Sequence, residues 1–262
     1  MRGSEEGKGV AVPGAVTDPT AVIGTEVTVQ SGDTALEAYL ARPAAGGPRP
    51  GIIVIHEAFG PNDHIHDLAR RFANAGFNAL APNLYTRIGA PPDMASTMDK
   101  MFALGDAQAV ADMEASAAYL RDLDGATGKV GCIGFCSGGR HTLLFATSSN
   151  KVDAAVDCWG GFIDRATMDA ETTDARPTPV IDKVSGVSCP LFVVGGAEDQ
   201  NPSPAVIHEL ERRLKDAGKD VTVKIFDGAG HAFLADYRDS YREGPAHELW
   251  PQLISFFQQH LA

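Results

Sequence analysis

The sequence predicts an α/β fold in which helices cover both faces of a mainly parallel sheet. Two patterns along the chain predict it. From residue 51 onward, apolar segments typical of strands alternate with segments typical of helices. Residues 51–55 form a continuous β-branched segment, as expected for a central strand buried on both faces. A length of 262 residues and a hydrophobic content of 44% provide enough apolar side chains for one such domain.

The N-terminal part is predicted to contain a leader and a β-hairpin. Residues 1–22 have early acidic residues and no apolar segment typical of a secretory signal, so we expect a flexible leader. Residues 26–30 and 36–40 are typical of two strands joined by a turn at Ser31-Gly32-Asp33. The hairpin and all that follows are assigned to one domain, residues 23–262.

The later elements follow from apolar periodicity and from helix start and stop signals. Strands are expected at residues 51–55, 77–80, 130–133, 153–158, 191–194 and 221–225. Helices are expected around residues 65–72, 106–123, 143–146 and 249–257, and after Ser203, an N-cap residue followed by Pro204. Residues 86–100 are rich in Gly, Pro and Met, and we expect either an irregular pocket wall or an ordinary surface loop.

Composition argues against several classes of partner. A formal net charge of −12 is unfavourable for binding nucleic acid or an anionic membrane. No stretch of 18 apolar residues typical of a membrane span occurs. The four cysteines have irregular spacing, and no zinc-type Cys/His pattern accompanies them. We therefore expect reduced thiols in the cytoplasm and no metal, with Cys132, Cys158 and Cys189 in the core.

The most informative segment is Gly134-Phe135-Cys136-Ser137-Gly138-Gly139, which lies between a predicted strand and a predicted helix. Glycines two residues on either side of Cys136 allow strand and helix to pack closely, because no Cβ separates them. Such a turn presents its central side chain as a nucleophile, and serine is the usual residue there. The segment predicts a nucleophilic Cys136; the alternative is a buried structural thiol.

Two further reactive residues follow later strands. Asp199 follows the strand at 191–194, and His231 follows the strand at 221–225. The carboxyl ends of parallel strands meet at one edge of a sheet, so both are expected beside the cysteine. We expect His231 to transfer a proton and Asp199 to orient its imidazole. Glu198 is the competitor for this acid role.

A carbonyl oxygen under attack gains negative charge and requires hydrogen-bond donors. The Ser137 N–H, at the start of a helix, is the first candidate, and the Ala58 N–H, after a central strand, is the second. Glu57 lies on the same loop, where its charge opposes catalysis unless it controls the protonation of the thiol. The candidate residues of the substrate pocket are Phe59, Tyr85, Trp159 and Phe233.

Together these segments resemble the dienelactone hydrolase family (carboxymethylenebutenolidases) of the α/β-hydrolases. The resemblance covers roughly residues 24–261. The matching segments are Ile55-His56-Glu57-Ala58-Phe59-Gly60, Pro82-Asn83-Leu84-Tyr85, Gly134-Phe135-Cys136-Ser137-Gly138-Gly139, Gly195-Gly196-Ala197-Glu198-Asp199 and Gly230-His231-Ala232-Phe233. The cysteine turn combined with the His-Glu loop is specific to this family among α/β-hydrolases.

The resemblance implies an α/β-hydrolase fold with a triad of Cys136, His231 and Asp199, in which Glu57 activates the thiol when substrate binds. It implies hydrolysis of an enol lactone or an activated ester through an acyl-cysteine, without a cofactor. The expected partner is a small-molecule lactone or ester, and the expected state is a monomer or small homo-oligomer. The alternatives are an acyltransferase or thioesterase-like enzyme, or a non-catalytic binding protein on the same scaffold.

The sequence departs from the family in one respect. Enzymes acting on dienelactone are expected to hold the substrate carboxylate with arginines. One is expected shortly after the histidine, where the chain has Leu234-Ala235, and another near residues 96–104, where it has Lys100. Arg87 and Arg238 are the nearby candidates to replace them. The departure concerns the carboxylate of dienelactone and leaves ester or lactone hydrolysis itself unaffected.

Overall fold

The computed structural model describes residues 11–164 and 173–262 of the chain. Within these residues, eight strands form one sheet in the order β1-β2-β4-β3-β5-β6-β7-β8. The strands are β1 (Val22–Ser31), β2 (Thr34–Pro43), β3 (Arg49–Ile55), β4 (Asn78–Pro82), β5 (Ala126–Phe135), β6 (Ala154–Cys158), β7 (Leu191–Gly196) and β8 (Val221–Phe226). The predicted α/β-hydrolase fold is confirmed by this sheet and by the structural neighbours reported below.

The sheet is parallel except at one end. The predicted hairpin is present, since β1 and β2 pair antiparallel, and β2 continues antiparallel to β4. From β4 to β8 all neighbouring strands are parallel. The carboxyl ends of β3, β5, β7 and β8 therefore meet at one edge, which gathers the loops that follow these strands.

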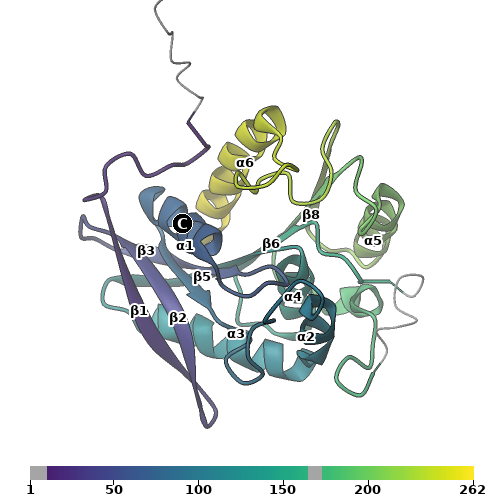
Figure 1. Ribbon diagram of the computed structural model, residues 1–262, viewed down its shortest axis with the longest axis horizontal. Helices are drawn as coiled ribbons and strands as arrows, with labels where there is room; N and C mark the ends of the chain where they lie inside the picture. The colour runs from purple at the N-terminus through teal and green to yellow at the C-terminus, as the bar shows by residue number, and fades with distance from the viewer. Residues whose placement is uncertain (1–10, 165–172) are drawn as a thin grey trace, which may run out of the picture.

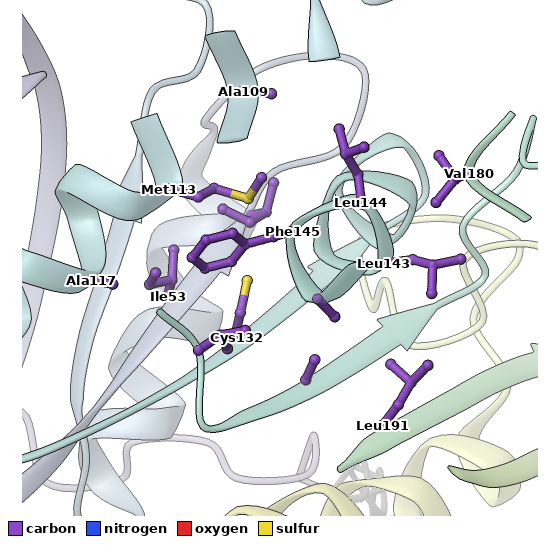
Figure 2. Packing of buried hydrophobic residues seen from close by; sticks show 14 of the residues in the cluster. Ile53, Ala109, Met113, Ala117, Cys132, Leu143, Leu144, Phe145, Val180 and Leu191 are labelled. Carbon is purple, nitrogen blue, oxygen red and sulfur yellow. The ribbon is translucent and has the colours of Figure 1, made fainter. Parts of the chain in front are cut away.

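Helices cover both faces of the sheet. The helices are α1 (Asp63–Asn74), α2 (Thr97–Ala103), α3 (Asp106–Arg121), α4 (Ser137–Ser148), the 3₁₀ helix η1 (Val180–Gly186), α5 (Pro204–Asp216) and α6 (Glu243–Leu261). Helices α3, α4 and α5 lie on one face, and α1 and α6 lie on the other (Figure 1). Their apolar side chains belong to two separate buried clusters, one on each face of the sheet. Figure 2 shows Phe145 of α4 lying between Met113 of α3 and Cys132 of β5. The sheet is thus buried on both sides, as its β-branched strands predict.

Local signals account for where several helices begin. Asn62 caps α1, because its side chain accepts a hydrogen bond from the Ile65 N–H at 3.1 Å. Ser203 caps α5 in the same way, with Pro204 as the first helical residue, as the sequence predicts. The segment 86–100 differs from its expected irregular conformation, because α2 begins inside it at Thr97.

The predicted leader is only partly covered by the structure, since residues 1–10 lie outside the described residues. From Pro13 onward the chain is docked on the domain. The Pro13 carbonyl accepts a hydrogen bond from Arg71 of α1 at 3.4 Å, and Gly14 lies against the Trp250 ring of α6. Among the described helices, none has the length and apolar character needed to cross a membrane.

Candidate active site

The turn between β5 and α4 places Cys136 at its tip. Cys136 has φ 57° and ψ −118°, a left-handed conformation that side chains rarely adopt. A Cβ on Gly134 would lie 2.0 Å from the Gly138 carbonyl oxygen, and a Cβ on Gly138 would lie 2.4 Å from the Ile55 carbonyl oxygen. The two glycines therefore permit the close approach of strand and helix that holds the thiol outward.

His231 and Asp199 lie together beyond the ends of β8 and β7. His231 Nδ1 is 2.8 Å from Asp199 Oδ2, and the other carboxylate oxygen accepts a hydrogen bond from the Asn201 N–H at 2.9 Å. Asp199 is 4% exposed, whereas the neighbouring Glu198 is exposed to solvent. The geometry selects Asp199 over Glu198 as the partner of the imidazole.

His231 is also in contact with the Cys136 thiol. Burial disfavours the charged imidazolium, but hydrogen bonds with Asp199 and Cys136 outweigh this effect and raise the pKa of His231 to about 10. The imidazole therefore carries a positive charge at neutral pH. A positive charge at this position stabilises a thiolate on Cys136.

The loop after β3 is held by two aromatic side chains. His56 Nδ1 is 2.7 Å from the Glu57 carbonyl oxygen, and His56 Nε2 accepts a hydrogen bond from the Leu84 N–H at 3.2 Å. Tyr85 donates to the Ala58 carbonyl oxygen at 3.1 Å, which fixes the peptide next to the candidate oxyanion donor. His56 and Tyr85 are both buried, and their hydrogen bonds hold this loop in place.

Glu57 is buried at 2% exposure and is bound by residues from the loop after β8. Its Oε2 accepts hydrogen bonds from Arg238 Nη2 at 2.8 Å and from the Tyr237 hydroxyl at 3.2 Å. Burial raises the pKa of Glu57, while Arg238, Tyr237 and His231 partly offset that effect. In this arrangement the hydrogen-bond partners of the carboxylate are Arg238 and Tyr237 rather than the thiol.

A cavity of about 290 Å³ opens beside Cys136 and His231. Its walls include the apolar side chains of Met101 and Phe162, and also Arg140, the residue that follows the Gly-Gly pair of the turn. The guanidinium of Arg140 is buried and pairs with Asp106 at 2.8 Å. The charge of this arginine is thereby balanced within the wall of the cavity.

The four aromatic residues expected in the pocket lie elsewhere. Trp159 and Phe233 are at most 1% exposed and pack in the core with their rings tilted by 55° and the centroids 4.8 Å apart. Tyr85 lies under the Ala58 loop, and Phe59 lies below the Arg238 guanidinium at 4.9 Å. None of the four lines the cavity beside the thiol. These four rings therefore lie outside the walls of this cavity, and core packing takes up those of Trp159 and Phe233.

The remaining cysteines are core thiols, as predicted. Cys132, Cys158 and Cys189 are buried, and all four cysteines of the chain are free. Burial raises the pKa of the Cys132 and Cys189 thiols to about 12, which keeps them protonated and unreactive. Within the described residues, no group of His, Cys, Asp or Glu side chains could hold a metal ion.

Known proteins resemble this chain over most of its length. The sequence pattern of the dienelactone hydrolase family matches residues 36–261. The chain belongs to the dienelactone hydrolase family. A Methylorubrum extorquens protein provisionally named carboxymethylenebutenolidase is 34% identical over 93% of this chain and 84% of its own length. A Yersinia pestis protein with the same provisional name is 32% identical over 90% of this chain and 88% of its own length.

A solved structure supports the same family. The crystal structure of a provisionally named dienelactone hydrolase from Klebsiella pneumoniae subsp. pneumoniae MGH 78578 superposes with a TM-score of 0.84 at 32% identity. The match covers 91% of this chain and 99% of that one. Membership of the dienelactone hydrolase family makes the chain a hydrolase of the ester or lactone type.

The structure shows the contacts of the basic residues that could replace the arginines expected in the family. Arg87 is 2.8 Å from the buried Asp112 carboxylate, to which it is bound, and it also donates to the Ser31 carbonyl oxygen. Lys100 donates to the Ile88 carbonyl oxygen. Arg238 alone of these three adjoins the site of this dienelactone hydrolase homologue, through its contact with Glu57.

Three residues near the site were not identified from the sequence. Arg140 follows the glycines of the turn directly, and that position was the one available signal for its place in the cavity wall. Tyr237 had no motif that marked it. Asp157, at the carboxyl end of β6, is 1% exposed and accepts a hydrogen bond from the Gly160 N–H at 2.8 Å. Burial raises the pKa of Asp157 to about 7.

Proposed function

We propose that the chain is a cysteine-dependent hydrolase that opens an enol lactone or cleaves an activated carboxylic ester through an acyl-cysteine intermediate. The observation that carries the proposal is the line of contacts from Cys136 through His231 to Asp199 beside a cavity. A thiol next to a charged imidazole is a strong nucleophile at neutral pH. Membership of the ester and lactone hydrolase family supports the same reaction class.

In the first half of the reaction, Cys136 gives its proton to Glu57, and the sulfur attacks the substrate carbonyl carbon as a thiolate beside the charged imidazole of His231. Asp199 accepts a hydrogen bond from Nδ1, which leaves Nε2 available to the thiol and stabilises the imidazolium. The ester C–O bond then breaks, and the charged His231 donates its Nε2 proton to the leaving oxygen. An enolate leaves readily because its charge is delocalised, so an enol lactone opens more easily than an alkyl ester.

In the second half, water attacks the acyl-cysteine carbon and transfers a proton to His231. The C–S bond breaks, the sulfur regains its proton from Glu57, and the carboxylic acid product leaves. Both tetrahedral intermediates carry a negative oxygen, to which the N–H groups of Ser137 and Ala58 donate in this proposal. Ser137 is the first residue of α4, whose positive end adds to the stabilisation.

We assign to Glu57 the control of the thiol proton. At rest, Arg238 and Tyr237 hold its carboxylate. When a substrate displaces Arg238, the carboxylate loses its main compensating charge while it remains buried, and its affinity for a proton rises. Glu57 can then accept the proton of Cys136, so that the thiolate forms when a substrate is present.

The proposed setting is the cytoplasm, with a small uncharged or carboxylated ester or lactone as the substrate. All four cysteines are free, which suits a reducing compartment. The cavity beside the thiol has about 290 Å³, a size that suits a small molecule, and its walls include Met101 and Phe162. Apolar walls favour an apolar group next to the reacting carbonyl.

A turnover screen tests the proposal. Enol lactones and phenyl esters, each with and without a carboxylate substituent, are offered to the wild-type protein and to Cys136→Ala. We expect hydrolysis by the wild type and only background hydrolysis by the variant. Equal turnover by both proteins would contradict the proposal, and the carboxylated and neutral pairs show whether the Arg238 position favours an anionic substrate.

A further inference from the structure

A different cavity lies at the other edge of the sheet. It has a volume of about 500 Å³ and is formed by the loop after β2, the first residues of β3 and β4, and the turn before β5. Arg49 is the first residue of β3, whereas Glu57 lies two residues beyond the last residue of that strand, Ile55. Seven residues of strand span about 20 Å, so this cavity is well separated from Cys136.

Arg49 contributes an unpaired positive charge to this cavity. Its backbone N–H donates to the Gly125 carbonyl oxygen at 2.8 Å, which fixes the start of β3. Its side chain forms no ion pair with an acidic residue in the described part of the chain. The Nε atom is buried and has no acceptor among the described residues. A guanidinium left in this state normally finds an acceptor from outside the chain.

Asn78 and Arg42 add further donors to the same cavity. Asn78 is 1% exposed, and its Oδ1 accepts a hydrogen bond from Arg42 Nε at 3.3 Å. This contact fixes the orientation of the amide, and its Nδ2 atom then has no partner among the described residues. Arg42 also donates from Nη2 to the Asp124 carbonyl oxygen at 2.8 Å. No carboxylate of the described residues pairs with the Arg42 guanidinium.

The charges and hydrogen-bond donors that line this cavity suit a dianionic ligand. Arg42 and Arg49 both line it, and within residues 11–164 and 173–262 neither guanidinium has a carboxylate partner, in a chain whose net charge is −12. The acidic side chain in its wall is that of Asp124, which pairs with neither arginine. A phosphate monoester offers close to two negative charges and three acceptor oxygens, whereas a carboxylate offers one charge.

We propose that this cavity binds a dianionic phosphate group, either free or carried by a small molecule. Arg42 and Arg49 supply the charge, and the Asn78 amide supplies a neutral donor between them. A volume of about 500 Å³ is larger than phosphate alone requires, so it accommodates an attached organic group. The ligand is separate from the ester or lactone that reacts at Cys136.

Calorimetric titration at constant ionic strength and about pH 8, where phosphate is a dianion, tests this site. The probes are inorganic phosphate and glucose 6-phosphate, with glucose as the uncharged control. We expect saturable binding of phosphate at one site per chain and none of glucose. Tighter binding of glucose 6-phosphate than of phosphate indicates a carried group, and equal binding indicates free phosphate; both outcomes support the dianion site.

Variants locate the binding. Arg49→Gln and Arg42→Gln should each weaken phosphate binding about tenfold or more, because each removes a charged donor. The matched control is Arg212→Gln, which removes an arginine from exposed ion pairs on α5 and should bind phosphate as the wild type does. Ester turnover at Cys136 should be unchanged in all three, which separates this site from the proposed catalytic function.

A further variant tests the site even if the two arginine variants fail to fold. Asp124→Asn removes the negative charge from the cavity wall without changing an ion pair, so it should tighten phosphate binding. The absence of saturable binding by the wild type would overturn the proposal. Equal weakening in Arg212→Gln, or unchanged affinity in Asp124→Asn, would overturn it as well, because the phosphate would then bind elsewhere.

Discussion

Arg238 Nη2 lies 2.8 Å from Glu57 Oε2, and this ion pair links the loop after β8 to the loop after β3. Glu57 is almost fully buried, while Arg238 retains 25% of its side-chain exposure. The arginine therefore offsets part of the cost of burying this charged carboxylate. The two loops that carry the site are held at a fixed spacing by this contact.

Removal of Arg238 should destabilise the protein in a pH-dependent way. Burial already raises the pKa of Glu57, and Arg238→Gln removes the main charge that compensates its carboxylate. A raised carboxyl pKa costs stability above that pKa and costs nothing in acid. We expect a loss of about 1–3 kcal/mol at pH 8 that fades towards pH 4, measured by urea unfolding. Adding Glu57→Gln to Arg238→Gln should restore most of the lost stability. Arg242→Gln is the matched control. A loss of stability that does not depend on pH would contradict this role of Arg238.

Asp199 and Glu198 are adjacent and offer a matched test of the acid role. Asp199→Asn should lower kcat by about 10²–10⁴-fold, because the imidazolium loses its charged partner. The hydrogen bond to Asp199 helps to raise the pKa of His231 to about 10, so the alkaline limit of the activity should move to lower pH. Glu198→Gln should behave as the wild type. A similar loss in both variants would contradict the assignment of the acid.

Cys136→Ser tests whether the site is adapted to a thiol. A hydroxyl does not ionise beside His231, so we expect kcat/KM for an activated ester to fall at least about 10²-fold. Cys189→Ala is the control, because this thiol is buried and protonated. Full activity in the serine variant would show that the sulfur is not required.

Asp157 should make the stability of the protein depend on pH near neutrality. Its folded-state pKa of about 7 lies above its ordinary value of 3.8, so the folded state keeps a proton that the unfolded state has lost. Stability therefore falls as pH rises from about 4 to 7 and is then constant. Asp157→Asn removes this cost and can still accept from the Gly160 N–H. We expect a gain of about 2–4 kcal/mol at pH 8 and almost none at pH 4, by thermal unfolding.

The sequence was sufficient for the elements that depend on local patterns. The hairpin, the parallel strands and the Ser203 cap were predicted because each follows from neighbouring residues. The positions of Cys136, Asp199 and His231 followed from one further rule, that the carboxyl ends of parallel strands meet at one edge. This rule needs only the order of the strands.

The features of the site that the sequence did not predict depend on contacts between distant segments of the chain. Arg238 and Glu57 are separated by 181 residues, and no pattern near either residue marks the other. Trp159 follows a strand end, as a pocket residue would, yet its ring packs against Phe233 in the core. Which of two equally placed aromatic rings faces a cavity is decided by the whole packing of the domain, which periodicity does not describe.

Covalent capture of the intermediate tests the central claim most directly. The protein is mixed with an activated acetate ester, quenched in acid during the first turnover, digested and measured by mass spectrometry. We predict one acetyl group, on the peptide that contains Cys136, and its absence in Cys136→Ala. Turnover without any adduct in the wild type, or an adduct on another side chain, would contradict an acyl-cysteine mechanism.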